Sequence, residues 1–206
     1  MTRRLLALVL ALVLSAGAEA KNTGYVFVSN EKTNNIAVID PKQDYKIARW
    51  IPTSHRPRDM KFGDDRRLLY VACGDDDEID VIDVATLRVA DHIPTGPSPE
   101  MFALSRDGKA LYVSNEEASS VQQISIADKI IMREIATSAE PEGVAISADG
   151  KTLYVTSEVT DMVHVVDIAA GSSRTTSSSG RGQGVFSCCL MGKNSGSPMN
   201  YQARYP

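Results

Sequence analysis

Residues 107–116 read DGKALYVSNE, and the chain carries a near copy, DGKTLYVTSE, at residues 149–158. A looser copy, DDRRLLYVAC, occupies residues 64–73. The tyrosines of the three copies, Tyr70, Tyr112 and Tyr154, are spaced 42 residues apart. A period of this length is typical of β-propellers, in which each repeat forms one blade.

Two further kinds of position keep the same step. Pro57, Pro99 and Pro141 also follow one another at intervals of 42 residues. Proline cannot donate a ladder hydrogen bond, so it suits the first residue of a strand. Another column closes Val-Ile-Asp or related runs, at Asp40, Asp83, Ser125 and Asp167, which are 43, 42 and 42 residues apart. Several columns in step indicate a true structural repeat.

Each repeat divides into four short segments with the composition and alternation of strands. After Pro57 these are residues 59–62, 69–71, 79–83 and 88–93. The Asp-Gly pairs of the other repeats suit a tight hairpin between the first two strands, because glycine accepts positive φ. The mature chain shows no helical period of useful length. We therefore predict an all-β fold, a β-propeller of four-stranded antiparallel blades.

The repeats account for only about three and a half blades, whereas a closed propeller has roughly four to eight. The segment YVFV at residues 25–28 matches a second strand, so the first repeat starts without an innermost strand. In a closed ring the C-terminus of the full-length protein would supply that strand. We expect residues 21–171 to form an open arc with exposed blade faces and unpaired edges.

The N-terminus has the three zones of a secretory signal peptide. Arg3 and Arg4 precede an apolar run of ten residues (5–14), and Ala18-Glu19-Ala20 forms a small-residue cleavage site. The run is too short to span the roughly 30 Å hydrocarbon core as a helix. We predict a signal peptide at residues 1–20, cleavage after Ala20 and a periplasmic mature chain without a membrane span; a retained anchor is the alternative.

The character of the chain changes after Gly171. Residues 172–206 lack a strand period, which is typical of a disordered tail. The genetic code supports a second interpretation, translation in the wrong frame. A frame shifted by two bases must encode Gly across Met191 and Gly192 and Glu across Met199 and Asn200, and this eight-residue spacing is that of the DGK…E repeats. We expect residues 172–206 to be an out-of-frame, disordered tail.

Composition excludes several classes. The net charge is −4 and no basic tract follows the chain, so a nucleic acid is an unsuitable partner. Cys73 is alone in the repeat region, where we expect a buried structural thiol. No Cys-x-x-Cys-His haem attachment is present. The single Trp50 argues against a quinoprotein dehydrogenase itself, so we expect no cofactor.

Tyr112-Val113-Ser114-Asn115 and Tyr154-Val155-Thr156-Ser157, each set after Asp-Gly-Lys, resemble the YVTN-repeat propellers. Residues 25–40, YVFVSNEKTNNIAVID, are similar to the opening of the periplasmic propeller associated with pyrroloquinoline-quinone (PQQ)-dependent catabolism. The resemblance covers residues 21–171. It implies an exported, seven-bladed ring whose gene lies near those for quinoprotein alcohol oxidation and for a transporter, and it carries over no catalytic residue.

Two columns of charged residues are candidates for ligand contact. Glu31, Glu116 and Glu158 recur at the ends of second strands and could ring one mouth of the central channel as an acidic site for a cation. Solvated strand-end carboxylates are the plainer interpretation. A second column follows the prolines, where an innermost strand lines the channel: Arg58, Glu100 and Glu142.

Metal and catalytic motifs are absent from the sequence pattern. His55, His92 and His164 lack the short spacing of a zinc site, so we expect no metal centre. The acidic run at residues 75–78 suits a solvated loop better than a calcium site, because it lacks a coordinating glycine pattern.

Two classes of function remain. The first is a non-catalytic periplasmic binding or scaffold propeller, with a small molecule or a periplasmic protein as partner, such as a quinoprotein dehydrogenase system. The second is a propeller enzyme of lactonase-like hydrolase or lyase type, in which channel carboxylates and a histidine act as general acid and base. Convergent groups with shifted pKa values would favour the enzyme.

Overall fold

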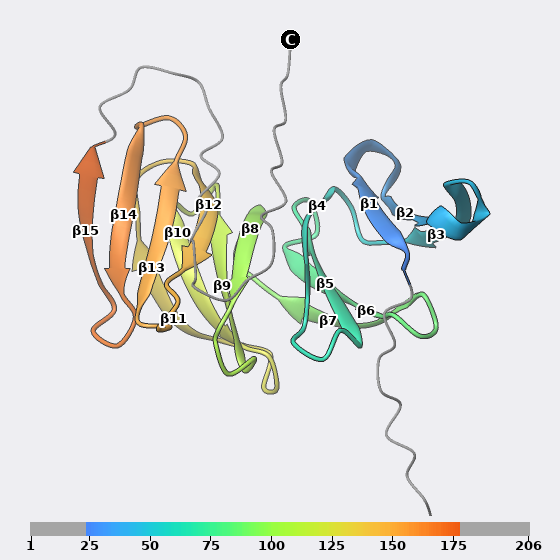
Figure 1. Cartoon of the computed structure of the whole chain (residues 1–206). Coiled ribbons are helices and arrows are strands. Elements are labelled where there is room, and N and C mark those ends of the chain that lie inside the picture. The colour runs from blue at the N-terminus through green and yellow to red at the C-terminus, as the bar shows by residue number, and fades with distance from the viewer. Residues whose placement is uncertain (1–23, 178–206) are drawn as a thin grey trace, which may run out of the picture.

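The computed structural model describes residues 24–177, which fold into four successive antiparallel sheets. The first sheet has three strands and the other three have four each, in the order of the chain. Figure 1 shows the sheets side by side, from β1 at one end to β15 at the other. The all-β fold of four-stranded antiparallel blades is thus confirmed, and the first blade starts on its second strand as predicted.

Each blade runs from an inner strand at the centre of the arc to an outer strand at its rim. Blade 1 comprises β1 (Val26–Asn30), β2 (Asn35–Asp40) and β3 (Lys46–Pro52), with the 3₁₀ turns η1 (Glu31–Thr33) and η2 (Pro41–Gln43). Blade 2 comprises β4 (Pro57–Phe62), β5 (Leu68–Cys73), β6 (Glu78–Asp83) and β7 (Arg88–Pro94). Blade 3 comprises β8 (Pro99–Leu104), β9 (Ala110–Asn115), β10 (Ser120–Ser125) and β11 (Ile130–Ala136). Blade 4 comprises β12 (Pro141–Ile146), β13 (Thr152–Ser157), β14 (Met162–Asp167) and β15 (Ser172–Ser177).

The last strand shows that the propeller ends later in the chain than we predicted. β15 pairs in register with β14, from Ser172 opposite Asp167 to Ser177 opposite Met162. The propeller therefore extends six residues beyond the expected limit at residue 171. An outer strand needs little apolar character because it covers only one neighbour, so the serine- and threonine-rich composition does not prevent pairing. The rest of the expected tail, and the signal peptide, lie outside the described residues.

The hairpins between first and second strands follow the Asp-Gly chemistry. Gly108 and Gly150 have φ of 67° and 73°, the left-handed region that glycine adopts without strain. In blade 3 the backbone nitrogen of Lys109 donates to Oδ1 of Asp107, 3.1 Å away, and this closes the turn. Blade 2 has Arg66 at the equivalent position, with φ of 55°. The looser copy of the repeat therefore keeps the turn with a residue that is strained in it.

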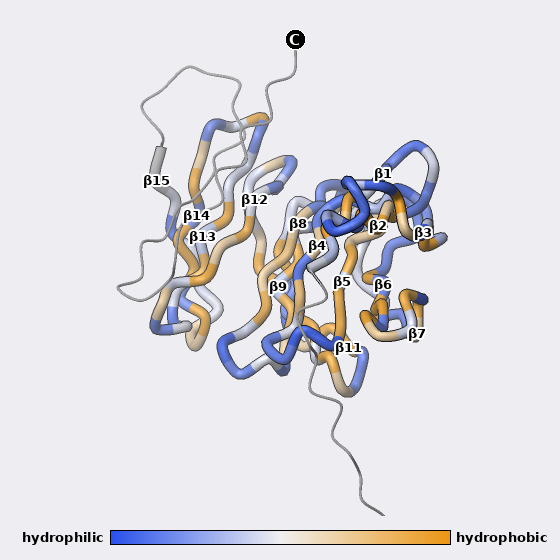
Figure 2. Tube along the Cα trace, turned by 45° about the vertical axis from the view of Figure 1, so that its right-hand side comes forward, coloured by the Kyte–Doolittle hydropathy of each residue, from blue (hydrophilic) through white to orange (hydrophobic). Residues whose placement is uncertain are grey.

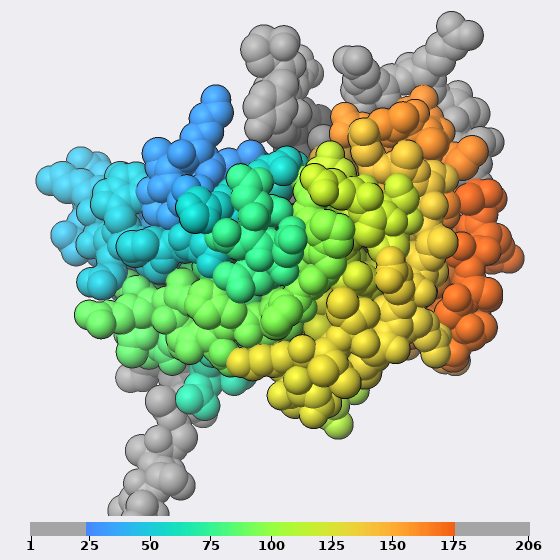
Figure 3. Space-filling view, turned by 180° about the vertical axis from the view of Figure 1, so that it is seen from behind, coloured from blue at the N-terminus to red at the C-terminus, as the bar shows by residue number. Residues whose placement is uncertain are grey.

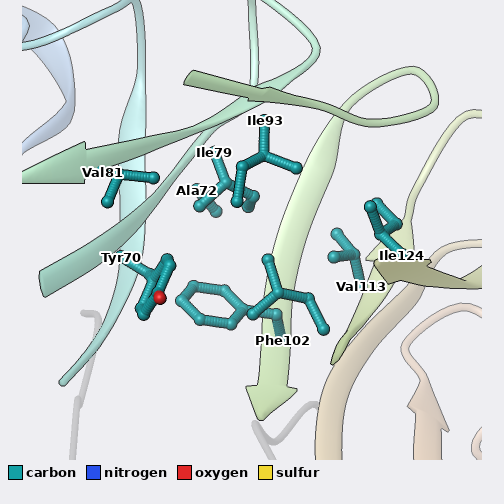
Figure 4. Packing of buried hydrophobic residues seen from close by; sticks show 9 residues of the cluster. Tyr70, Ala72, Ile79, Val81, Ile93, Phe102, Val113 and Ile124 are labelled. Atoms are coloured by element: carbon teal, nitrogen blue, oxygen red, sulfur yellow. The ribbon is translucent and has the colours of Figure 1, made fainter. Parts of the chain in front are cut away.

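The hydrophobic core lies between the blades. Figure 2 shows hydrophobic residues along the strands and hydrophilic ones along many of the connecting loops. Between blades 2 and 3, Phe102 is fully buried and packs with Tyr70 and Ile79 across the interface (Figure 4). Similar clusters join blade 1 to blade 2 and blade 3 to blade 4. Each blade is therefore held by its neighbours, as in other repeat folds.

The space-filling view shows the blades as contiguous layers in the order of the chain (Figure 3). Of the hydrophobic residues on β1, Val26 and Val28 are 43% and 41% exposed. Within residues 24–177, no helix is long and apolar enough to cross a membrane.

Candidate functional site

Five of the six predicted channel residues lie around one hollow at the inner end of the blades. The hollow measures about 30 Å³, which is room for a few waters or one small ionic group. Its lining, which we call the hub site, consists of Arg58, Glu100, Glu116, Glu140, Pro141, Glu142 and Glu158. The sixth predicted residue, Glu31, borders it, with Oε1 3.8 Å from Nε of Arg58.

The start of each inner strand aims these side chains inward. The register between first and second strands breaks just after the proline, between Pro57 and Met60 in blade 2 and at the equivalent places in blades 3 and 4. The carbonyl groups freed there reach the preceding blade. The hydroxyl of Ser29 donates to the backbone carbonyl oxygen of Arg58 at 3.0 Å. The hydroxyl of Ser114 donates to the backbone carbonyl oxygen of Glu142 at 2.7 Å. The hub residues therefore sit on backbone fixed by two blades.

Glu100 is the centre of the hub site. Its side chain is 2% exposed, with Nε of Arg58 2.5 Å from Oε2 and Nη2 of Arg56 3.3 Å from Oε1. Burial, and next the neighbouring Glu116, raise the pKa of Glu100 to about 8, although both arginines act in the opposite direction. Desolvation outweighs attraction because the arginine side chains remain partly in water.

Glu116 is the complementary partner of Glu100. A hydrogen bond with Glu100 lowers the pKa of Glu116, and the hydroxyl of Ser98, 3.3 Å from Oε2, lowers it further. Glu100 therefore holds the proton at neutral pH while Glu116 is ionised. The pair divides the roles of donor and acceptor between two adjacent blade-3 carboxyl groups.

Blade 4 contributes negative charge without a matching cation. Among residues 24–177, no lysine, arginine or histidine lies within ion-pair distance of Glu140, Glu142 or Glu158. Burial, and next the charge of Glu158, raise the pKa of Glu142. The hub site is thus asymmetric, with both arginines on blade 2 and unbalanced carboxylates on blade 4.

Sequence reasoning missed Glu140, which lines the hub site, and Arg56, whose Nη2 lies 3.3 Å from Oε1 of Glu100. They occupy one column with Ser98, 42 residues apart, and all three have φ between 51° and 56°. Gly74 replaces in blade 2 the glutamate of the other blades, and a Cβ there would come within 3.3 Å of Cδ of Arg56. In the sequence, the glycine at position 74 could have indicated that blade 2 has room for a larger side chain at position 56.

Other singled-out residues have structural roles. Cys73 is buried and free of a disulfide, as predicted. His164 is buried, and its Nε2 accepts a hydrogen bond from the backbone nitrogen of Ser138 at 2.9 Å. In the loop at residues 75–78, Asp76 pairs with Nδ1 of His55 at 2.8 Å.

A larger hollow of about 270 Å³ lies against β13, β14 and β15, away from the predicted residues.

These observations define the class of protein: an arc of β-propeller blades whose inner strands present a charged site. The chain belongs to the YNCE-like β-propeller family, which matches residues 20–147. Among curated proteins no match to the chain is found.

Solved structures agree with this fold. The chain is similar to Kuenenia stuttgartiensis hydrazine synthase, with 26% identity and a TM-score of 0.66 over 75% of this chain and 46% of that one. It is also similar to the dihydro-heme d1 dehydrogenase NirN in complex with DHE (16% identity, TM-score 0.60, 76% of this chain and 35% of that one). A functionally unknown protein from Desulfotomaculum acetoxidans DSM 771 matches with 15% identity and a TM-score of 0.60, over 71% of this chain and 51% of that one. The chain thus spans about half or less of the length of each.

Proposed function

We propose that this chain is part of a non-catalytic binding propeller whose hub site takes a small, positively charged ligand group. The observation that carries the proposal is the convergence of Glu140, Glu142 and Glu158 on one hollow, where none of the three has an ion-pair partner among the described residues. An excess of carboxylates in a cleft raises the local concentration of cations. An ammonium group fits the size of the hollow and can donate to several carboxylates at once.

The arginines of blade 2 support selectivity. Arg56 and Arg58 lie beside Glu100 and Glu116. The carboxylates of blade 4 have no such basic partner among the described residues, so attraction for a cation is concentrated there. An alkyl chain that ends in an ammonium group suits this arrangement.

The cellular setting that we propose is the periplasm. The leader at residues 1–20 supports export, and the resemblance of residues 25–40 supports a role beside PQQ-dependent alcohol catabolism. In that setting the propeller is an accessory that binds a small molecule or a quinoprotein dehydrogenase component, without a cofactor of its own.

The test is calorimetric titration of the purified chain with putrescine, and with butane-1,4-diol as its neutral match. We expect putrescine to bind and the diol not to bind. Glu142→Gln and Glu158→Gln each remove one hub charge and should weaken putrescine binding about tenfold, or 1.4 kcal/mol. Added salt should weaken it as well.

Glu117→Gln is the matched control, because Glu117 is exposed and lies outside the hub lining. It should leave the affinity unchanged. If Glu117→Gln and Glu142→Gln weaken binding equally, the attraction is a property of the net charge and the hub site is not a binding site. Equal binding of the diol would also contradict the proposal.

One observation favours the enzyme alternative, a lactonase-like hydrolase or lyase. Glu100 and Glu116 have pKa values shifted in opposite directions, which is the pattern of a general acid and base. The histidine expected in such a site is not among the residues that line the hollow. Hydrolysis of a simple lactone that is lost in Glu116→Gln, with putrescine binding retained, would support the enzyme over the binding protein.

A further inference from the structure

A second group of chemically active side chains lies on blade 2, away from the hub site. Nδ1 of His92 is 2.9 Å from Oδ1 of Asp80 and 3.1 Å from Oε1 of Glu78. The hydroxyl of Ser54 is 2.6 Å from the same Glu78 oxygen and 2.9 Å from the same Asp80 oxygen. Three ligand atoms, one from each titratable residue, all lie within 4.8 Å of one another.

Strand pairing produces this group. Asp80 on β6 lies directly opposite His92 on β7, and Glu78 precedes Asp80 by two residues, so that all three side chains share one face. A register shift between Val81 and Ile82 sets this pairing. The backbone nitrogen of Ser54 donates to Oδ2 of Asp80 at 2.8 Å, which leaves Oδ1 turned toward Glu78 and His92.

The group contains more negative charge than its surroundings balance. Asp80 is 0% exposed, and within residues 24–177 neither Asp80 nor Glu78 forms an ion pair with a lysine or arginine. A buried carboxylate is ordinarily paired with a cation or bound to a metal. The exposed fraction of the His92 side chain, 51%, leaves a path from solvent to the group.

We propose that Glu78, Asp80 and His92 bind a divalent transition-metal ion such as Zn²⁺, with Ser54 beside it. Two carboxylate oxygens and one imidazole nitrogen are ligands that Zn²⁺ takes at roughly 2.0–2.2 Å. Ligand atoms at that radius in a tetrahedral arrangement are about 3.4 Å apart. Nδ1 of His92 lies 2.9 Å from Asp80 and 3.1 Å from Glu78, so a small outward movement of the side chains would accommodate the ion. The hydrogen bond from Ser54 to Asp80 orients a ligand in the way that outer partners of metal sites do.

The composition of the site selects among metals. Ca²⁺ takes six to eight oxygen ligands, whereas an imidazole nitrogen suits zinc and its neighbours. The thiol of Cys73 is not counted as a ligand, because it is not in the group of ligand atoms that all lie within 4.8 Å of one another. A histidine coordinates a metal through the nitrogen of a neutral imidazole, so binding of the ion at Nδ1 of His92 would be coupled to pH.

The site belongs to blade 2 alone among the blades described. One period later Glu78, Asp80 and His92 are replaced by Ser120, Gln122 and Glu134. The proposal therefore does not follow from the blade architecture, which needs neither Glu78 nor His92. This difference allows both residues to be changed with little effect on the fold.

The experiment is titration of the full chain with ZnCl₂ by calorimetry. It is done in a Cys188→Ser, Cys189→Ser background, because those two thiols are strong zinc ligands in their own right. We expect one equivalent of Zn²⁺ to bind, and His92→Ala and Glu78→Gln each to weaken it at least tenfold. Circular dichroism should show both variants to be folded.

His55→Ala is the matched control, since Nδ1 of His55 lies 2.8 Å from Asp76 in a pair that has no third ligand among the described residues. It should bind Zn²⁺ like the parent chain. The proposal is overturned if the parent binds no Zn²⁺ up to about 1 mM, if folded His92→Ala keeps the parent affinity, or if Ca²⁺ binds more tightly than Zn²⁺.

Discussion

The backbone nitrogen of Ser54 donates to Oδ2 of Asp80 at 2.8 Å, and this bond recurs in each of the following blades. One period later Gly96 donates to Oε1 of Gln122 at 2.7 Å. A further period on, Ser138 donates to Nε2 of His164 at 2.9 Å. The propeller therefore requires an acceptor in this column and accepts three side-chain chemistries for it, only one of which loses its acceptor near neutral pH.

That difference makes stability depend on pH through His164. Burial lowers the pKa of His164 below its usual value of 6.5 in the folded chain. The unfolded state then binds the proton more readily, so the contribution of His164 is complete above pH 6.5 and is lost as pH falls through the lowered folded pKa. His164→Gln, which copies Gln122, should remove this part of the pH dependence. Urea unfolding between pH 7 and pH 5 measures it, and a parallel loss in the variant and the parent would contradict the assignment.

Glu100 should show the opposite sign. Its folded pKa, about 8, exceeds the usual 4.5, so its stabilising contribution is complete below pH 4.5 and is lost as pH rises through 8. Glu100→Gln keeps the shape without the titration. Relative to the parent, the variant should gain at least about 1 kcal/mol in free energy of unfolding between pH 6 and pH 9. A difference that stays constant over this range would show that Glu100 does not titrate there.

Replacement of Arg66 by glycine should stabilise the folded chain. Arg66 has φ of 55° at the position where blades 3 and 4 have Gly108 and Gly150. Arg66→Gly should raise the free energy of unfolding by about 1 kcal/mol, because the left-handed conformation is strained for residues with a Cβ. Arg67→Gly is the control: it removes the same charge without relieving positive φ and should not stabilise. Thermal melting of both variants decides the matter.

The leader has a direct test. Expression of the full chain in a Gram-negative host should yield a periplasmic product that begins at Lys21, because we predict cleavage after Ala20. Intact mass and N-terminal sequencing give the answer. A product that keeps residues 1–20 and sediments with membranes would support the retained anchor.

The tail makes a prediction about the gene. Read with a two-base shift, the codons for residues 186–205 should encode FLLPDGKELWVTNELSGTV, which is a further copy of the repeat. Its glycine falls at Met191, 41 positions after Gly150, close to the period of the propeller. Sequencing the nucleotides across this region tests the idea, and any other translation of that frame would rule it out.

Much of the fold could be predicted because repetition exposes it. The prolines and the alternating segments occur three times or more and the Asp-Gly turns twice, so the blades and the inward position of Glu100 and Glu142 could be derived from spacing alone. The pairing of Asp80 with His92 could not. Without the register shift after Val81, Asp80 would lie opposite Asp91, and His92 would point to the other face. A bulge of one residue thus decides whether these side chains meet.

The glycine at position 74 has a consequence for how such proteins diversify. A glutamate at this position in every blade would crowd like charges around the hub site. Blade 2 has Gly74 there instead, and the side chain of Arg56 occupies the space. The substituted positions are not members of the apolar clusters between blades. Residues of the hub site can therefore be substituted in one blade at a time. Ligand preference can change in this way while the fold of the blades is kept.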